Sequence, residues 1–308
     1  MNPRRFITLL ALFVVLCGCC QPLRAAAFEI IVNHLGYDTR GAKRLVVQSG
    51  EEMDLARFEV LDSEGHVAFE GPLQEVGPVD GWKGRFFHQG DFSALGRAGA
   101  YRIQVKDARS EPFALRGQLL PEACLSDLVY YFRIQRCSGV YDKADHAIPF
   151  FGEPERKRVD VHGGWFDASG DVSKYLGYLT EANHMVPQGS PMAVWCFLQA
   201  VDLLGTHPGQ RLRSVLPLLR EEALYGADFL HRMQDPEGYF YLSVMDGSTK
   251  DPGLREICGY EGLDHVKHGR TKAAFREGGG IAIAALARTS TLKRAGDYSS
   301  AQYLAAAE

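Results

Sequence analysis

The sequence, 308 residues long, has no large excess of charge of either sign. It carries 34 lysines and arginines against 38 aspartates and glutamates, which gives a net charge of −4 at pH 7. Proteins that bind nucleic acids or anionic membrane surfaces usually concentrate positive charge. We therefore expect no nucleic-acid partner and no charge-driven attachment to a membrane.

The motifs of several well-known enzyme classes are also absent. The chain contains no G-x-S-x-G, no H-E-x-x-H, no P-loop and no G-x-G-x-x-G between a strand and a helix. These motifs position a serine nucleophile, a catalytic zinc ion and nucleotide phosphates. Any chemistry in this chain must therefore rest on other side chains.

Cysteine is scarce outside the N-terminus. Three of the seven cysteines fall within the first 20 residues, and the other four are widely spread, at Cys124, Cys137, Cys196 and Cys258. Disulfide-stapled scaffolds need much denser cysteine, and a chain of this length can build its own core. The spacing is compatible with one disulfide and equally with free thiols.

The one long hydrophobic run lies at the N-terminus. A basic start precedes an apolar stretch from Phe6 to Leu16, and small residues follow it. This pattern predicts a secretory signal peptide over residues 1–27, and hence a secreted or periplasmic protein. Leu16-Cys17-Gly18-Cys19 also resembles an imperfect lipobox, so lipid anchoring through Cys19 is a minority alternative, and the only membrane attachment that we expect.

Residues 28–116 read as short strands separated by turns. The segments alternate apolar and polar residues or are rich in β-branched and aromatic ones, and breaks such as Asp62–Gly65 separate them. Short strands without a long helix predict an immunoglobulin-like β-sandwich. Such a domain supports, links or binds, and says nothing by itself about catalysis.

Residues 117–308 change to a helical period. Several predicted helices are apolar around more than one face, which suits helices buried between an inner and an outer layer, as in an α/α barrel. The predicted helices cover residues 125–137, 190–205, 211–234, 276–289 and 297–308. The last one reaches Glu308 without a cap, so we expect the chain to be part of a longer reading frame.

The stretch "HGGWFDASGDVSKYLGYL", residues 162–179, carries the candidate chemistry. Asp167 and Asp171 lie four residues apart, and an ionised carboxylate can act as a base toward water. Trp165 and Phe166 offer flat faces of the kind that stack on sugar rings. We expect a helix to begin after Asp171, and its N-terminal dipole would keep the pair ionised.

A structural interpretation of the same residues is equally simple. Aspartate is a favoured N-cap residue, so Asp171 could serve only to begin the helix. Trp165 could belong to the hydrophobic core. On local chemistry alone, capping is the better explanation.

The wider sequence resembles glycoside hydrolase family 9. "GGWFDASGDVSKYL" is similar to the family signature G-G-W-Y-D-A-G-D-x-x-K-[FY], and "YYFRIQRC", "FLHRMQDPEGYFY" and "FREGGGIAIAALA" resemble further family segments. In the first domain, "IIVNHLGY", "GDFSALGRAGAYRIQV" and "SEPFAL" resemble the N-terminal immunoglobulin-like module that some members carry. The resemblance extends from about residue 28 to the end of the sequence.

The resemblance implies an (α/α)6 barrel that hydrolyses β-linked glucan, such as cellulose, with inversion. By position, Asp171 matches the principal base and Asp167 its helper, while Trp165 and Phe166 would contact substrate. The family's general acid is a glutamate near the end of the module, which we expect beyond residue 308. A polysaccharide or oligosaccharide is the expected partner, and the protein is expected to be a monomer.

Two departures from the family pattern qualify these expectations. Ser169 is an extra residue between the two aspartates. Some members bind a structural zinc ion through a cysteine equivalent to Cys137 and a Cys-His pair before the motif, and the missing second cysteine argues against zinc. No cofactor is expected to be required, although a structural calcium ion would be compatible. Two alternatives stay open, a non-catalytic carbohydrate-binding or surface protein, and a hydrolase for another β-glycan such as glucosamine oligomers.

Overall fold

The computed structural model describes residues 28–77, 79–168, 170–179, 185–186, 189–206, 209–261 and 266–308. The predicted signal peptide with Cys19, and the extra Ser169, lie outside the described residues. The chain divides into two compact units, with the boundary between Leu120 and Pro121. Each unit is described by itself.

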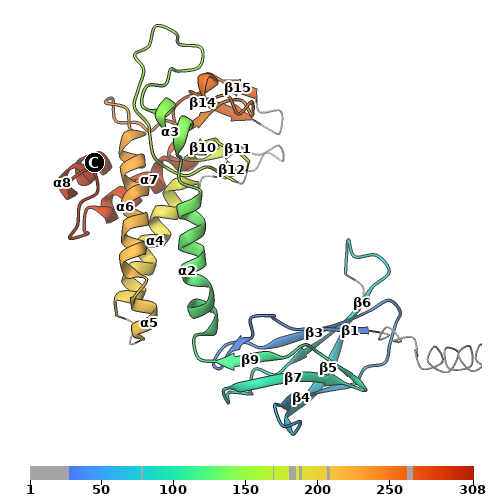
Figure 1. Ribbon diagram of the computed structural model, residues 1–308. Coiled ribbons are helices and arrows are strands. Elements are labelled where there is room, and N and C mark those ends of the chain that lie inside the picture. Colours follow the sequence, from blue (N-terminus) through green and yellow to red (C-terminus); the bar gives the residue numbers. More distant parts are fainter. Residues whose placement is uncertain are drawn as a thin grey trace, which may run out of the picture. The chain divides into compact units, whose positions relative to one another are not determined.

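The first unit is a β-sandwich, as the sequence predicts (Figure 1). Its strands pair in the order β1-β3-β6-β5-β4-β7-β9-β2, with β8 beside β7. Alternating residues such as Leu45 and Val47 point into a core that includes Phe58 and Phe92. The strands are β1 (Phe28–Ile31), β2 (Tyr37–Asp38), β3 (Arg44–Ser49), β4 (Arg57–Asp62), β5 (Val67–Gly77), β6 (Phe86–Asp91), β7 (Gly99–Val105), β8 (Ala108–Arg109) and β9 (Phe113–Arg116).

The second unit combines helices with a small sheet (Figure 1). Helix α4 packs against α6 and α7, and α7 packs against α8. The helices are α2 (Leu119–Ile134), α3 (Gly139–Asp145), α4 (Ser190–Gly205), α5 (Gln210–Arg213), α6 (Leu216–Arg232), α7 (Gly280–Thr289) and α8 (Ser300–Ala307), with shorter turns η1 (Pro252–Leu254) and η2 (Phe275–Gly279). Among the residues that the structure describes, no helix is both long and apolar enough to cross a membrane.

The sheet of this unit pairs its strands in the order β10-β13-β14-β11-β12, with β15 beside β14. The strands are β10 (Lys174–Tyr175), β11 (Tyr178–Leu179), β12 (Met185–Val186), β13 (Ser243–Met245), β14 (Glu256–Glu261) and β15 (Val266–His268). The prediction of a helix after Asp171 is therefore wrong, and Asp171 caps no helix. Lys174 is fully buried in β10, so the segment is fixed by tertiary contacts and not by its local helix propensity.

The predicted helices form, with the predicted bounds for α4 and with shifted or divided bounds for the others. The segment 211–234 divides into α5 and α6 because Pro217 lies in the first turn of α6, where its missing N–H costs nothing. The N-cap residue of α4 is Gly189. The segment 276–289 begins with a π-helical turn, and its Gly278 has φ +99° with no room for a Cβ beside Leu176.

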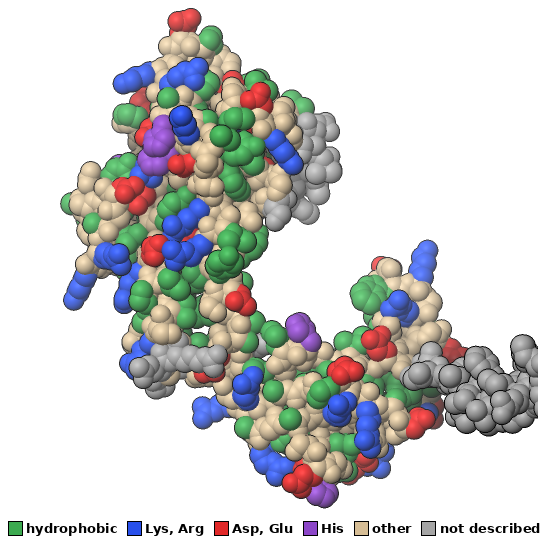
Figure 2. All heavy atoms as spheres, in the orientation of Figure 1, with side chains coloured by type: hydrophobic (Ala, Val, Ile, Leu, Met, Phe, Trp, Pro, Cys, Tyr) green, Lys and Arg blue, Asp and Glu red, His purple; other side chains and the backbone are tan. Residues whose placement is uncertain are grey.

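Several hydrophobic side chains of the helical unit reach its surface (Figure 2). On α2 the exposed ones are Leu128, Tyr130, Tyr131 and Ile134. The inner face of the same helix contributes Val129 to the core shared with α4 and α6. Helix α2 is therefore apolar on more than one face, in agreement with the sequence pattern.

Candidate active site

The two candidate aspartates lie on one loop, residues 163–173, which we call the aspartate loop. Its entrance is tied to the end of α2, because the Phe166 N–H donates to the Gln135 carbonyl (2.8 Å) and the Cys137 N–H donates to the Gly164 carbonyl (2.8 Å). Gly164 has φ +74°, and a Cβ there would lie 2.7 Å from the Phe229 ring. Glycine is thus required where the loop crosses α6.

A tight turn places Asp167 and Asp171 on its two sides. The Asp171 N–H donates to the Ala168 carbonyl (3.0 Å), and the Asp167 N–H donates to the Ser173 carbonyl (3.0 Å). The Asp171 carboxylate accepts the Ser173 N–H through Oδ1 (2.8 Å). The backbone therefore brings the two carboxylates together and fixes the orientation of Asp171.

The electrostatics of the pair differ from the expectation of a helix entrance. Loss of hydration in the protein surroundings, and secondly the negative charge of Asp171, raise the pKa of Asp167. The expected lowering by a helix dipole is wrong for Asp167, because no helix begins here. Asp167 still contacts water at the surface, so it can exchange protons with solvent.

This shift predicts a pH-dependent effect of Asp167→Asn on stability. A raised pKa means that the folded state binds the proton more tightly than the unfolded chain, so the carboxylate destabilises the fold as the pH rises through that pKa. We expect the variant to melt at a higher temperature than the parent at pH 7, and this difference to vanish in acid, where both states are protonated. Thermal unfolding at several pH values measures it, and a lower melting temperature at pH 7 would contradict it.

A cavity of about 360 Å³ adjoins Asp167. Four of its ten lining residues are aromatic, namely Phe132, Trp165, Phe166 and Tyr175. A space with aromatic walls and one carboxylate is suited to a sugar ring, which has apolar faces and polar edges. The structure thus brings three of the four predicted site residues to one cavity and places Asp171 on the adjoining turn.

Trp165 is mostly a core residue, with 4% of its surface exposed. Its ring packs edge-on against Phe132 (centroids 5.5 Å apart), and its Nε1–H donates to Oε1 of the buried Glu222 (2.9 Å). Arg136 binds the same carboxylate with two N–H groups. This network fixes the floor of the cavity, and sequence reasoning missed Glu222, for which the sequence gives no local signal.

Two further glutamates of the helical unit are engaged in ion pairs. Glu277 accepts from Arg270 (2.9 Å) and Glu256 accepts from Lys267 (2.7 Å). Each of the two carboxylates is therefore paired with a neighbouring cation.

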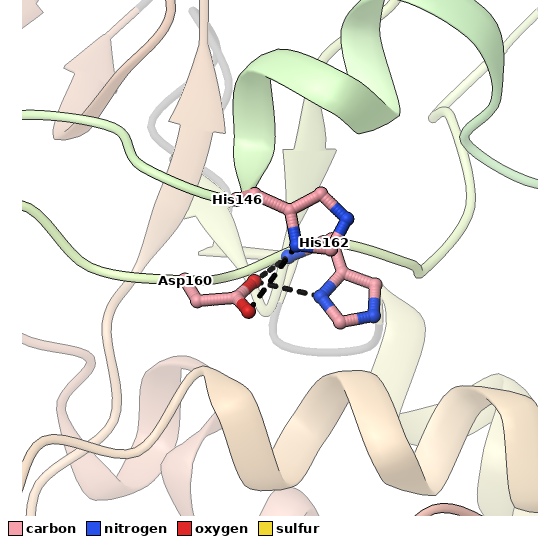
Figure 3. A group of neighbouring side chains, drawn as sticks. All are labelled: His146, Asp160 and His162. Atoms are coloured by element: carbon pink, nitrogen blue, oxygen red, sulfur yellow. Dashed lines mark hydrogen bonds and ion pairs between the residues drawn. The ribbon is translucent and has the colours of Figure 1, made fainter.

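Two histidines and an aspartate form a separate cluster at the surface (Figure 3). The Nδ1 atoms of His146 and His162 lie 3.3 Å and 2.7 Å from the two carboxylate oxygens of Asp160, and the imidazole rings stack with centroids 4.0 Å apart. Their ligand atoms lie within 4.8 Å of one another. The charge of His162 and its hydrogen bonds help to lower the pKa of Asp160, although partial burial opposes this.

The residues beside this cluster do not fit a cysteine-based zinc site. A structural zinc ion needs four ligands close together, and among the described residues Cys137 belongs to no group of potential metal ligands. Its thiol lies 3.5 Å from Asp145 Oδ2 instead. Asp145, which precedes His146, accepts hydrogen bonds from Arg255 on both oxygens and pairs with Lys174. Its oxygens are thus occupied. All four cysteines in the described part of the chain are free thiols.

Comparison with known proteins gives the context of this site. Residues 25–110 match the family described as "Cellulase N-terminal ig-like domain". Endoglucanase C of Cellulomonas fimi is 25% identical over 48% of this chain and 16% of its own length. The chain therefore spans a small part of this curated relative.

Solved structures match both units. The glycoside hydrolase family 9 endoglucanase J30 has a TM-score of 0.63 at 25% identity over 88% of this chain and 51% of its own, and a Zn-binding triple mutant of it matches equally. A complex of AaCel9A with a cellobiose-like isofagomine shares the fold, with a TM-score of 0.58 at 22% identity over 91% of this chain and 50% of that one.

These matches define the architecture of the chain, which is an immunoglobulin-like domain followed by part of an (α/α)6 barrel. The resemblance to glycoside hydrolase family 9 with an N-terminal immunoglobulin-like domain is confirmed, and the chain covers about half the length of the solved family 9 endoglucanases.

Proposed function

We propose that this chain forms the water-activating side of a secreted or periplasmic glycoside hydrolase that cleaves β-linked glucan with inversion. The observation that carries the proposal is the position of Asp167 and Asp171 on one tight turn beside an aromatic cavity. The family 9 relatives support β-glucan as the substrate class. The chain itself spans only part of those proteins.

In the proposed reaction Asp171 is the general base. Its Oδ1 is held by the Ser173 amide, so its carboxylate is oriented before substrate arrives. It would take a proton from a water molecule as the water oxygen attacks the anomeric carbon, and the glycosidic bond would break on the opposite face. The departing oxygen would be protonated by a general acid, which we assign to a glutamate outside these 308 residues.

Asp167 is the proposed helper. Because its pKa is raised, it accepts a proton more readily than an ordinary aspartate and can share the hydrogen bonds of the attacking water. Trp165 would act mainly by shaping the cavity floor, and Phe166 by contact with the sugar.

The experiment that tests the proposal compares glucans of opposite anomeric linkage. A protein that contains this chain and the proposed general-acid glutamate is expected to release reducing ends from a soluble β-1,4-glucan. It is expected to release none from an α-1,4-glucan. Isothermal titration with β-1,4-oligosaccharides distinguishes the alternative. Binding without release of reducing ends would favour a non-catalytic carbohydrate-binding protein.

A further inference from the structure

A buried ion cluster lies behind the aspartate loop. Asp145, at the end of α3, and Lys174, in β10, have no exposed surface, and Arg255, just before β14, is 1% exposed. The Asp145 carboxylate accepts from Arg255 Nε (2.6 Å) and Nη2 (2.9 Å), and Lys174 Nζ lies 2.7 Å from its Oδ2. One carboxylate thus neutralises part of the charge of two buried cations.

Each cation also binds backbone carbonyls beside or within the aspartate loop. Lys174 Nζ donates to the carbonyls of Val161 (2.8 Å) and Gly163 (2.7 Å), at the entrance. Arg255 Nη1 donates to the carbonyl of Val172 (2.7 Å), at the exit. The three side chains therefore connect both ends of the loop that carries the two candidate carboxylates.

The strength of this connection follows from burial. An ion taken out of water costs several kcal/mol unless it is paired and its hydrogen-bonding groups are satisfied. Charge-assisted hydrogen bonds in such surroundings are short and directional. Here all three ions come from elements far apart in the sequence, so moving either end of the loop would leave a buried charge without its partner.

We infer that the Asp145–Lys174–Arg255 cluster positions the aspartate loop without the help of a metal ion. The effect of the cluster on catalysis presupposes the proposed glycoside hydrolase function, whereas its effect on the loop does not. Asp145 is thereby a positioning residue that acts through Lys174 and Arg255 on the backbone around Asp167 and Asp171.

The same cluster disfavours a metal ion beside Cys137. Two fixed positive charges lie within hydrogen-bonding distance of Asp145, and they would repel a divalent cation placed there. The Cys137 thiol is itself a donor to Asp145 Oδ2, at 3.5 Å. The surroundings of the Cys137 thiol are therefore occupied by the Asp145 salt bridges, and among the described residues they offer no second thiolate for a metal ion.

Hydrogen exchange on the 308-residue chain tests the inference directly. The loop amides of Phe166, Asp167 and Asp171 are hydrogen-bonded. In Asp145→Asn their exchange is expected to rise about a hundredfold, because the variant leaves two buried cations without their full counter-charge. The matched control is Asp235→Asn, a buried carboxylate of the same unit that binds Arg156 and Tyr241. It is expected to affect residues 233–241 and not the loop.

Lys174→Met keeps the Asp145–Arg255 pair. It is the variant to measure if Asp145→Asn does not fold. It is expected to raise exchange at the loop entrance and leave Ser173 protected. In a protein that hydrolyses β-glucan it should lower kcat about a hundredfold and leave KM within about twofold. Loop exchange equal to that of the Asp235→Asn control would overturn the inference.

Zinc addition and removal give the second readout. An excess of EDTA is expected to leave loop exchange unchanged, and added zinc is expected not to raise loop protection. Slower loop exchange with zinc, or faster exchange with EDTA, would show that a metal holds the loop and would overturn the inference. These readouts need no turnover, so failure of the proposed glycosidase function would leave their result intact.

Discussion

Asp171→Asn is expected to lower kcat for β-glucan hydrolysis by about 10²- to 10⁴-fold, the usual contribution of a positioned general base. The asparagine amide has the size of the carboxylate and can still accept the Ser173 N–H through its oxygen. It cannot take a proton from water. The loss should therefore fall on the chemical step and spare the fold.

The measurement is steady-state kinetics on a soluble β-1,4-glucan, with thermal unfolding of the same samples. Asp202→Asn is the matched control, since Asp202 is an exposed carboxylate of α4 that pairs with Arg288. It is expected to leave kcat unchanged. A kcat for Asp171→Asn equal to that of the control would remove Asp171 from the mechanism.

Trp165→Ala is expected to destabilise the helical unit by about 3–5 kcal/mol, the usual cost of removing a large buried aromatic side chain. The ring fills space between Phe132, Phe197 and Gly226, where the Gly226 Cα already touches it so closely that a Cβ would lie 2.2 Å from the ring. Its loss also removes a donor from the buried Glu222. The variant should therefore lose stability before it loses any specific sugar contact.

Denaturant unfolding of Trp165→Ala measures this effect, and Trp82→Ala is the control. Trp82 is 55% exposed in the β-sandwich, so its removal is expected to change stability by less than about 0.5 kcal/mol. If Trp165→Ala kept the parent stability and lost only glycan affinity, Trp165 would be a cleft residue and not part of the core.

Much of the fold could be predicted from local patterns. Alternating residues such as Leu45 and Val47 specify strands because one face of each must be buried. Helix α4 was predicted with its bounds, since Pro191 suits a first turn. The split at Pro217 also had a local signal.

The region after Asp171 could not be predicted in this way. Its strand character depends on Lys174, which is buried only because Asp145 and Arg255 come from distant parts of the chain. Local propensity contains no such information. The aspartate spacing directed attention to the correct loop, but the pKa of Asp167 depends on the turn and on the surrounding protein.

The anomer of the first product tests the central claim most directly. Proton NMR during hydrolysis of a β-1,4-glucan follows the newly formed reducing end before it equilibrates. A base at Asp171 that activates water on the face opposite the leaving group predicts the α-anomer as the first product. The β-anomer would mean retention through a covalent intermediate, and would contradict the assignment of Asp171 as the base toward water.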